Sequence, residues 1–114
     1  MGRVRRDISA YQGMWLFVMF DLPVDDAQAR NNYTRFRKSL LANGFTMIQF
    51  SIYARYFHCE EACQPHQRKI KTMVPSKGQV RILMVTDRQF GKMVVYQGKI
   101  PQKPENPPAQ LQFF

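Results

Sequence analysis

The sequence predicts an α+β fold in a single domain of 114 residues, and three observations support this prediction. Segments rich in β-branched and aromatic residues indicate strands. The segments between them repeat apolar side chains at helical spacing. The chain is also too short for a doubly wound parallel sheet. We therefore expect a ferredoxin-like βαββαβ sandwich, with an antiparallel sheet, both helices on one of its faces and an extra C-terminal strand.

The first strand is predicted at residues 14–20, where seven consecutive apolar residues are too few to span a membrane. The strand ends at Asp21, because Pro23 cannot donate a hydrogen bond into a sheet. Asp21 is therefore either a loop cap or a functional carboxylate. Residues 1–13 are polar and basic, and we expect a basic N-terminal arm that is either solvated or in contact with phosphate. The ferredoxin-like domain is expected to cover residues 14–98.

The first helix is predicted to begin with a cap at Asp25 or Asp26 and to end near Asn43. Apolar side chains recur along it at spacings of three and four residues, so one face packs on the sheet. Gly44 occupies the position of a left-handed C-terminal cap. The outward side chains that could bind nucleic acid are Arg30, Arg35, Arg37 and Lys38. The alternative is a basic face that is only solvated.

Residues 45–57 are expected to be strand, but thirteen residues exceed the usual length, so a break or bulge is predicted near residues 49–51. The aromatic side chains of this segment could stack on nucleobases. Packing in the core or in a subunit interface is the favoured interpretation. The candidates for base stacking are Phe50, Tyr53 and Tyr56.

The second helix is predicted at Glu60–Met73, and Pro65 is expected to lie close to the start of its regular part. The spacing His-Cys-x3-Cys-x2-His around this helix is compatible with a zinc site. However, Cys59, Cys63 and His66 share the inner face of the helix, so packing in the core is favoured over zinc.

Two more strands are predicted, at residues 80–86 and 92–97. From Lys99 onward, four prolines exclude a helix. We expect residues 99–114 to form a Pro-rich tail that begins as an extended spacer. The tail becomes apolar again at its end, where its large side chains are Leu111, Phe113 and Phe114.

The formal net charge of +9 predicts an anionic partner, and nucleic acid is the first candidate. No apolar run approaches the roughly 20 residues needed to cross a bilayer, so no membrane association is expected. The basic start of the chain lacks the apolar core of a signal peptide. The two cysteines form no disulfide framework, which is typical of a reducing, cytoplasmic location.

Asp21 alone cannot hold a magnesium ion, because Mg²⁺ requires several oxygen ligands. A second copy of the chain could place another Asp21 beside it by two-fold symmetry. Two facing carboxylates repel each other, and sharing a proton or a hard cation relieves the repulsion. The alternative is that Asp21 only caps the following loop.

Three segments of the sequence resemble the family of small CRISPR adaptation proteins, the second of the two core CRISPR-associated proteins, in its type II version. They are residues 14–24, 36–55 and 78–90, and they follow one another in the order and spacing of the family. The resemblance implies a ferredoxin-like homodimer. It also implies that Asp21 is the metal ligand and catalytic residue, with Mg²⁺ or Mn²⁺ shared between the two Asp21 side chains of the dimer.

The same resemblance implies a nucleic-acid-binding scaffold in spacer acquisition, which joins the CRISPR integrase and holds double-stranded spacer DNA. It further implies a possible metal-dependent endonuclease that cleaves RNA or DNA. Family members use C-terminal segments in assembly, so Leu111, Phe113 and Phe114 are expected to bind a partner. The alternatives are a stand-alone Mg²⁺-dependent endoribonuclease and a non-catalytic single-strand RNA binder.

Overall fold

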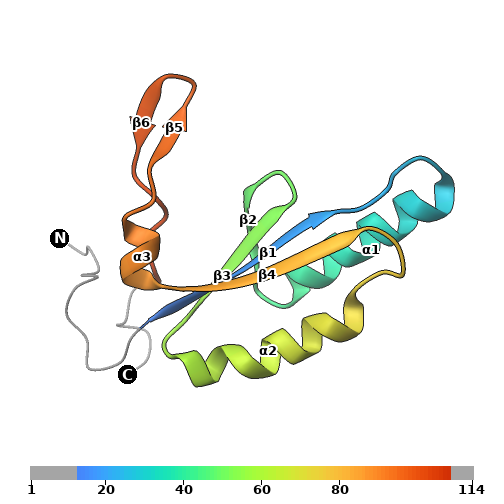
Figure 1. Ribbon diagram of the computed structural model, residues 1–114, viewed down its shortest axis with the longest axis horizontal. Helices are drawn as coiled ribbons and strands as arrows, with labels where there is room; N and C mark the ends of the chain where they lie inside the picture. The colour runs from blue at the N-terminus through green and yellow to red at the C-terminus, as the bar shows by residue number, and fades with distance from the viewer. Residues whose placement is uncertain (1–12, 109–114) are drawn as a thin grey trace.

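The centre of the molecule is a four-stranded antiparallel sheet (Figure 1). The computed structural model describes residues 13–108. The strands of the sheet are β1 (Met14–Asp21), β2 (Thr46–Gln49), β3 (Ile52–Phe57) and β4 (Gln79–Thr86). Their order is β2-β3-β1-β4, so β1 lies between β3 and β4 and is antiparallel to both. With one helix after β1 and another after β3, this is the predicted ferredoxin-like fold.

Two helices, α1 (Ala27–Ala42) and α2 (Glu60–Met73), cover the same face of the sheet. Successive side chains of a strand point to opposite faces, so every second residue of β1 contributes to this core. The central residues of the cluster are Leu16, Val18 and Phe20 of β1, Phe36 and Leu40 of α1, and Cys63 and Ile70 of α2. The prediction that both helices pack on one face is confirmed.

The two ends of α1 follow the signals in the sequence. Asp26 is the N-cap, and its Oδ1 accepts a 2.7 Å hydrogen bond from the Ala29 N–H. Of the two predicted candidates for the helix cap, Asp26 and not Asp25 is therefore the cap. At the other end Gly44 has a φ of +83°, the left-handed conformation expected just after a helix.

α2 begins at Glu60 and continues through Pro65, so the expectation that its regular part starts close to Pro65 is wrong. Pro65 removes only the hydrogen bond that its own N–H would donate to the carbonyl of Glu61. Glu60 and Glu61 lie in the first turn, where negative charge interacts favourably with the helix dipole. In the described part of the chain, no helix is long and apolar enough to cross a membrane.

β2 and β3 are joined by a tight turn at Phe50 and Ser51, which confirms the predicted break in residues 45–57. Ser51 has a φ of +64°, a conformation that is uncommon for a residue with a side chain. Its carbonyl oxygen accepts a 3.0 Å hydrogen bond from the Phe20 N–H. The turn is therefore anchored to the central strand, close to where that strand ends.

A short helix, α3 (Asp87–Gly91), follows β4 directly and was not predicted. Thr86 caps it: the Thr86 hydroxyl accepts from the Gln89 N–H at 3.0 Å, and the Gln89 side chain accepts from the Thr86 N–H at 2.9 Å. Such reciprocal bonds satisfy two donors at a helix start. The indole of Trp15 donates a 2.6 Å hydrogen bond to Asp87, which fixes α3 against β1.

β5 (Val95–Gln97) and β6 (Ile100–Gln102) form a separate hairpin that projects away from the main sheet (Figure 1). The strand predicted at residues 92–97 is thus shorter than expected and does not extend the central sheet. The extended spacer was expected to begin at Lys99, but β6 lies within this segment and pairs with β5. Proline is tolerated in a strand at an edge, so Pro101 is compatible with this pairing.

The second face of the sheet is only partly covered. Trp15 stacks on Phe90 of α3 with ring centroids 4.0 Å apart, and Ala54 is buried beside them. Away from α3 the face is open: Leu83 of β4 remains 49% exposed and Ile52 of β3 is half-buried. An apolar face without a covering layer is typical of a surface that binds a partner.

Candidate metal and nucleic-acid site

Asp21 is the last residue of β1, and its side chain is exposed where the strand ends. The loop before β4 packs tightly against its backbone. A Cβ atom at Gly78 would lie 2.7 Å from the Asp21 carbonyl oxygen, and Gly78 has a φ of +92°. Glycine is therefore required there. This role of Gly78 was not predicted, because the close approach is a tertiary contact that leaves no local pattern in the sequence.

The direction of the Asp21 side chain follows from its place in the strand. Trp15 and Phe17 belong to the cluster on the second face of the sheet. Side chains alternate along a strand, so Met19 and Asp21 are on that same face. Asp21 therefore lies at the end of the open apolar face, on the side of the sheet opposite to α1 and α2.

The donor chemistry of Asp21 suits a hard cation, because Mg²⁺ and Mn²⁺ prefer carboxylate oxygens. Within residues 13–108, however, no three His, Cys, Asp or Glu side chains are placed to hold a metal ion. One carboxylate leaves most positions around such an ion without a protein ligand. Further oxygen donors would have to come from a second copy of the chain or from phosphate.

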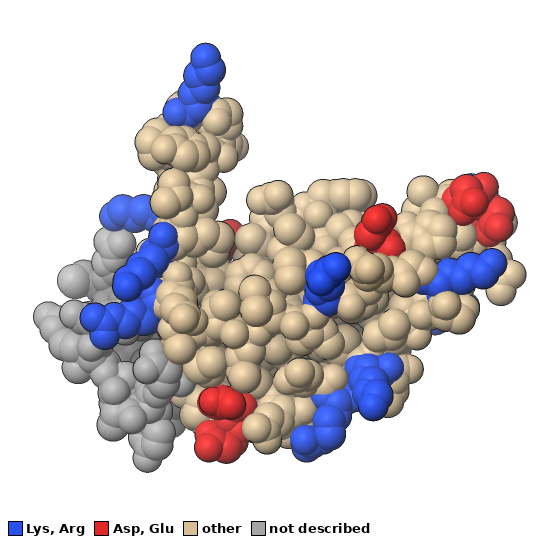
Figure 2. Space-filling model, in the orientation of Figure 1, with Lys and Arg blue, Asp and Glu red and all other residues tan. Residues whose placement is uncertain are grey.

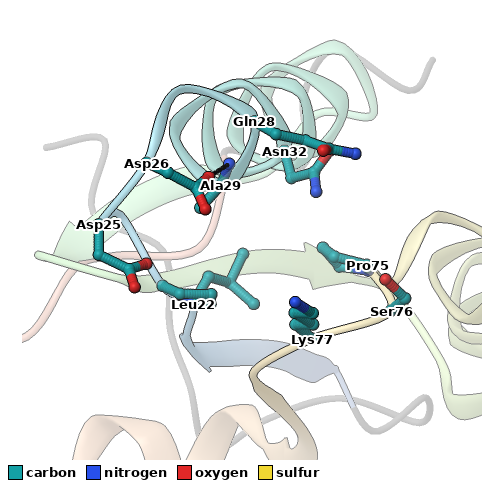
Figure 3. Close-up of a pocket in the computed structure, with 10 residues that line it drawn as sticks. Leu22, Asp25, Asp26, Gln28, Ala29, Asn32, Pro75, Ser76 and Lys77 are labelled. Carbon is teal, nitrogen blue, oxygen red and sulfur yellow. Dashed lines mark hydrogen bonds between the residues drawn. The ribbon is translucent and has the colours of Figure 1, made fainter.

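A pocket of about 190 Å³ lies beside this site, between the start of α1 and the loop before β4 (Figure 3). Leu22 and Pro75 form apolar parts of its wall. Its polar side chains are Asp25, Asp26, Gln28, Asn32, Ser76 and Lys77. Its two carboxylates and its lysine give the pocket a mixed charge, which favours neither a phosphate nor a metal ion.

The four cations predicted on α1 are all exposed, as expected. They belong to two different sides of the helix. Arg30 and Arg37 lie one turn before and one turn after Tyr33, next to the face that packs on the core. Arg35 and Lys38 line a shallow depression of about 440 Å³ on the outer side of the helix. Whether these residues bind nucleic acid stays a prediction.

Basic side chains are not confined to α1. Figure 2 shows Lys and Arg along the length of one face of the molecule and on the projecting hairpin, with acidic side chains at only a few places. A distributed positive surface of this kind attracts phosphate without reading sequence.

Cys63 and His66 lie on the inner face of α2, as predicted. Cys63 is fully buried, and this burial, with a smaller effect of Cys59 and Glu60, raises the pKa of its thiol to about 11. His66 packs against the ring of Phe57 and contacts the Arg55 guanidinium through Nε2 at 2.9 Å. Cys63 is thus part of the core, and His66 is a half-buried side chain that packs beside it on the same helix.

The three aromatic candidates for base stacking differ in exposure. Tyr53 is 2% exposed and belongs to the core beneath the helices. Tyr56 is half-buried and contacts Trp15. Phe50, at the turn between β2 and β3, is 78% exposed. Phe50 is therefore the most exposed of the three.

The predicted partner-binding residues at the C-terminus lie outside the described residues, as does most of the basic N-terminal arm. These residues are Leu111, Phe113 and Phe114. Their role stays a prediction.

The fold and this site define a class of protein: a small, strongly basic ferredoxin-like domain with an exposed carboxylate at the end of its central strand. Comparison with known proteins identifies the family. The model of the family described as "CRISPR associated protein Cas2" matches residues 14–93. The chain belongs to the Cas2 family.

Curated relatives are similar over most of their length, and each bears the name CRISPR-associated endoribonuclease Cas2. The protein from Parvibaculum lavamentivorans is 48% identical, over 89% of this chain and all of the relative. The protein from Flavobacterium psychrophilum is 37% identical, over 94% of this chain and 93% of the relative. The protein from Streptococcus mutans strain UA159 is 36% identical, over 89% and 93% respectively.

Proposed function

We propose that this chain is a nucleic-acid-binding subunit of CRISPR spacer acquisition, which works as a homodimer together with the CRISPR integrase. The observation that carries the proposal is the family match over residues 14–93. The net charge of +9 and the exposed cations of α1 support a role in holding double-stranded spacer DNA.

The open face of the sheet supports the homodimer. Its exposed apolar side chains, such as Leu83, would be removed from water by a second copy of the same face. Asp21 lies at the end of that face, so a two-fold axis near it would bring two carboxylates together. Leu83→Glu should therefore weaken dimerisation, which analytical ultracentrifugation measures. Leu41→Glu, at a similarly exposed leucine of α1 on the other side of the sheet, is the matched control.

The experiment that tests the proposed function is a spacer-acquisition assay in cells that lack the native gene. Wild-type chain should restore acquisition and should be recovered with the integrase in a pull-down. If the chain neither restores spacer acquisition nor binds the integrase in the pull-down, the proposal is contradicted.

A second candidate function is a metal-dependent endonuclease, and the name shared by the curated relatives favours it. The residues that would hold the ion are the two Asp21 side chains of a dimer. A divalent ion bound there would polarise a phosphoryl oxygen or activate a water. The chain's own contribution is to present Asp21 rigidly, through the packing of Gly78 against its backbone.

Asp21→Ala should abolish any cleavage of RNA or DNA, while DNA binding and dimerisation persist. Cleavage is measured on purified protein with Mg²⁺ or Mn²⁺ and with a chelator as control. Activity that survives in Asp21→Ala would mean that the nuclease is a contaminant or lies elsewhere. Spacer acquisition should survive the substitution, because a scaffold depends on shape and charge rather than on this carboxylate.

A further inference from the structure

Phe50 has the largest exposed fraction among the large apolar side chains of residues 13–108, at 78%. It sits in the turn between β2 and β3, beside the end of β1. A two-residue turn needs no aromatic side chain, and turns favour small or polar residues instead. The fold therefore does not explain a phenylalanine at this position.

Contacts with α1 and with β1 restrict the turn that carries Phe50. The ring of Phe50 stacks on Tyr33 of α1, with ring centroids 6.4 Å apart and an interplanar angle of 27°. The neighbouring Ser51 is fixed by the hydrogen bond from Phe20 and by a 3.4 Å contact between its hydroxyl and that of Tyr33. An ordered aromatic surface loses little conformational entropy when a ligand stacks on it.

Positive charge accompanies this aromatic pair. Arg30 and Arg37 lie three residues before and four residues after Tyr33, so they are its neighbours on the helix surface. Both side chains are exposed. Aromatic rings that are flanked by cations are the usual means by which proteins hold single-stranded nucleic acid, since bases stack and phosphates are neutralised.

We propose that Phe50, supported by Tyr33, stacks on an unpaired nucleobase of bound nucleic acid, with Arg30 and Arg37 as contacts to the adjoining phosphates. This inference rests on the proposed nucleic-acid-binding function and names the structural feature that it recognises, an unpaired base. Stacking does not distinguish one base from another, so recognition is independent of sequence.

A second copy of the chain is a poorer fit for Phe50. Tyr33, on which Phe50 stacks, packs against the core cluster on the helix-covered side of the sheet. The open apolar face is on the opposite side. A dimer formed through the open face therefore leaves Phe50 accessible.

The test compares two fluorescein-labelled DNA duplexes of equal paired length, one blunt and one with a short single-stranded overhang. Phe50→Ala should bind the overhang duplex about 5- to 150-fold more weakly than wild type, the range for loss of one stacked base. Its affinity for the blunt duplex and the salt dependence of that affinity should not change. Phe50→Trp should retain tight binding, because it preserves a stacking surface.

Met47→Ala is the matched control, because Met47 is also an exposed apolar residue of the β2–β3 hairpin. It should bind both duplexes like wild type. Equal affinity of Phe50→Ala and wild type for the overhang duplex would overturn the proposal. So would an equal loss on both duplexes, or a change in oligomeric state that accompanies the loss.

The failure of stacking can be told apart from failure of the proposed function. If wild type binds both duplexes and Phe50→Ala changes neither, only the stacking role is wrong. If wild type binds neither duplex, both the stacking role and the DNA-binding function are wrong.

Discussion

Cys63 illustrates at the residue scale how burial controls chemistry. Its side chain is fully buried, and its pKa is raised from 9.0 to about 11. In the unfolded chain the thiol ionises near its ordinary pKa, whereas the folded chain keeps it protonated. The stabilisation that results is complete below pH 9 and is lost as the pH rises from 9 towards 11.

We therefore predict that the urea midpoint of the wild type falls between pH 9 and pH 11 more steeply than that of Cys63→Ala, both under reducing conditions. At neutral pH, iodoacetamide should modify the partly exposed Cys59 and leave Cys63 intact, as mass spectrometry would detect. Equal pH slopes for the two proteins, or rapid modification of Cys63, would contradict this account.

The contacts of Arg55 are an example, at the scale of one residue, of what the sequence did not predict. The alternation of β3 placed a cation on the same face as Tyr53 and Phe57, where a charge is costly. The structure provides partners for this cation. The Arg55 guanidinium donates a 2.7 Å hydrogen bond to the Asn43 carbonyl, contacts His66 and lies 4.7 Å from the centre of the Phe57 ring. Asn43 follows α1 and His66 lies in α2, so no local pattern revealed these two partners.

At the scale of elements, α1 carries the prediction about nucleic acid. Arg30→Gln combined with Arg37→Gln should lower the affinity for duplex DNA and make the log–log salt slope less negative, by roughly 0.9 for each phosphate that the variant no longer neutralises. Arg35→Gln with Lys38→Gln is the matched control, since it removes the same charge from the other side of the helix. Fluorescence anisotropy at several salt concentrations measures both quantities. Equal effects of the two pairs would show that only net charge matters.

The elements also show why some predictions succeeded. α1 and α2 carry strong apolar periodicity, and α1 has caps that are local in the sequence, so α1 and α2 were both predicted. α3, which begins directly after the strand predicted at residues 80–86, was not predicted. Its start was nevertheless encoded by Thr86 and Gln89, which match the spacing of a capping box.

The candidate site divides in the same way. The position of Asp21 at the end of β1 and the exposure of the α1 cations were predicted, because each follows from a local pattern, and the roles of these residues stay predictions. The residues that support the site were not predicted. Gly78 approaches the end of β1 from a distant loop, and Ser51 adopts a positive φ although it is not a glycine. β5 pairs with β6 and not with the central sheet. This pairing depends on tertiary structure, and a short apolar run does not specify it.

At the scale of the whole molecule, the central sheet offers edges for assembly. Among the described strands, β2 and β4 each pair on one side only. An extended peptide can add to such an edge, forming main-chain hydrogen bonds while its side chains fill pockets. The apolar end of the C-terminal tail has the composition for this, and we propose an edge of the second subunit of the proposed homodimer, or of the proposed integrase partner, as its binding site.

Deletion of residues 109–114 should therefore leave a folded domain that associates more weakly with its dimer partner or with the integrase. Gel filtration and pull-down of the truncated chain measure the two associations, and circular dichroism checks that the fold is kept. If both associations match those of the full-length chain, the tail has no part in assembly.

The position of Trp15 has a practical consequence. It is the single tryptophan of the chain, and it stacks on Phe90 and donates to Asp87, both in α3. Intrinsic fluorescence therefore reports on the surroundings of Trp15, which include the contact that joins α3 to the sheet and the ring of Tyr56. Separation of α3 would expose the indole to water and shift its emission to longer wavelengths. Binding of a partner that displaces α3 can thus be followed in unmodified protein, without an attached dye.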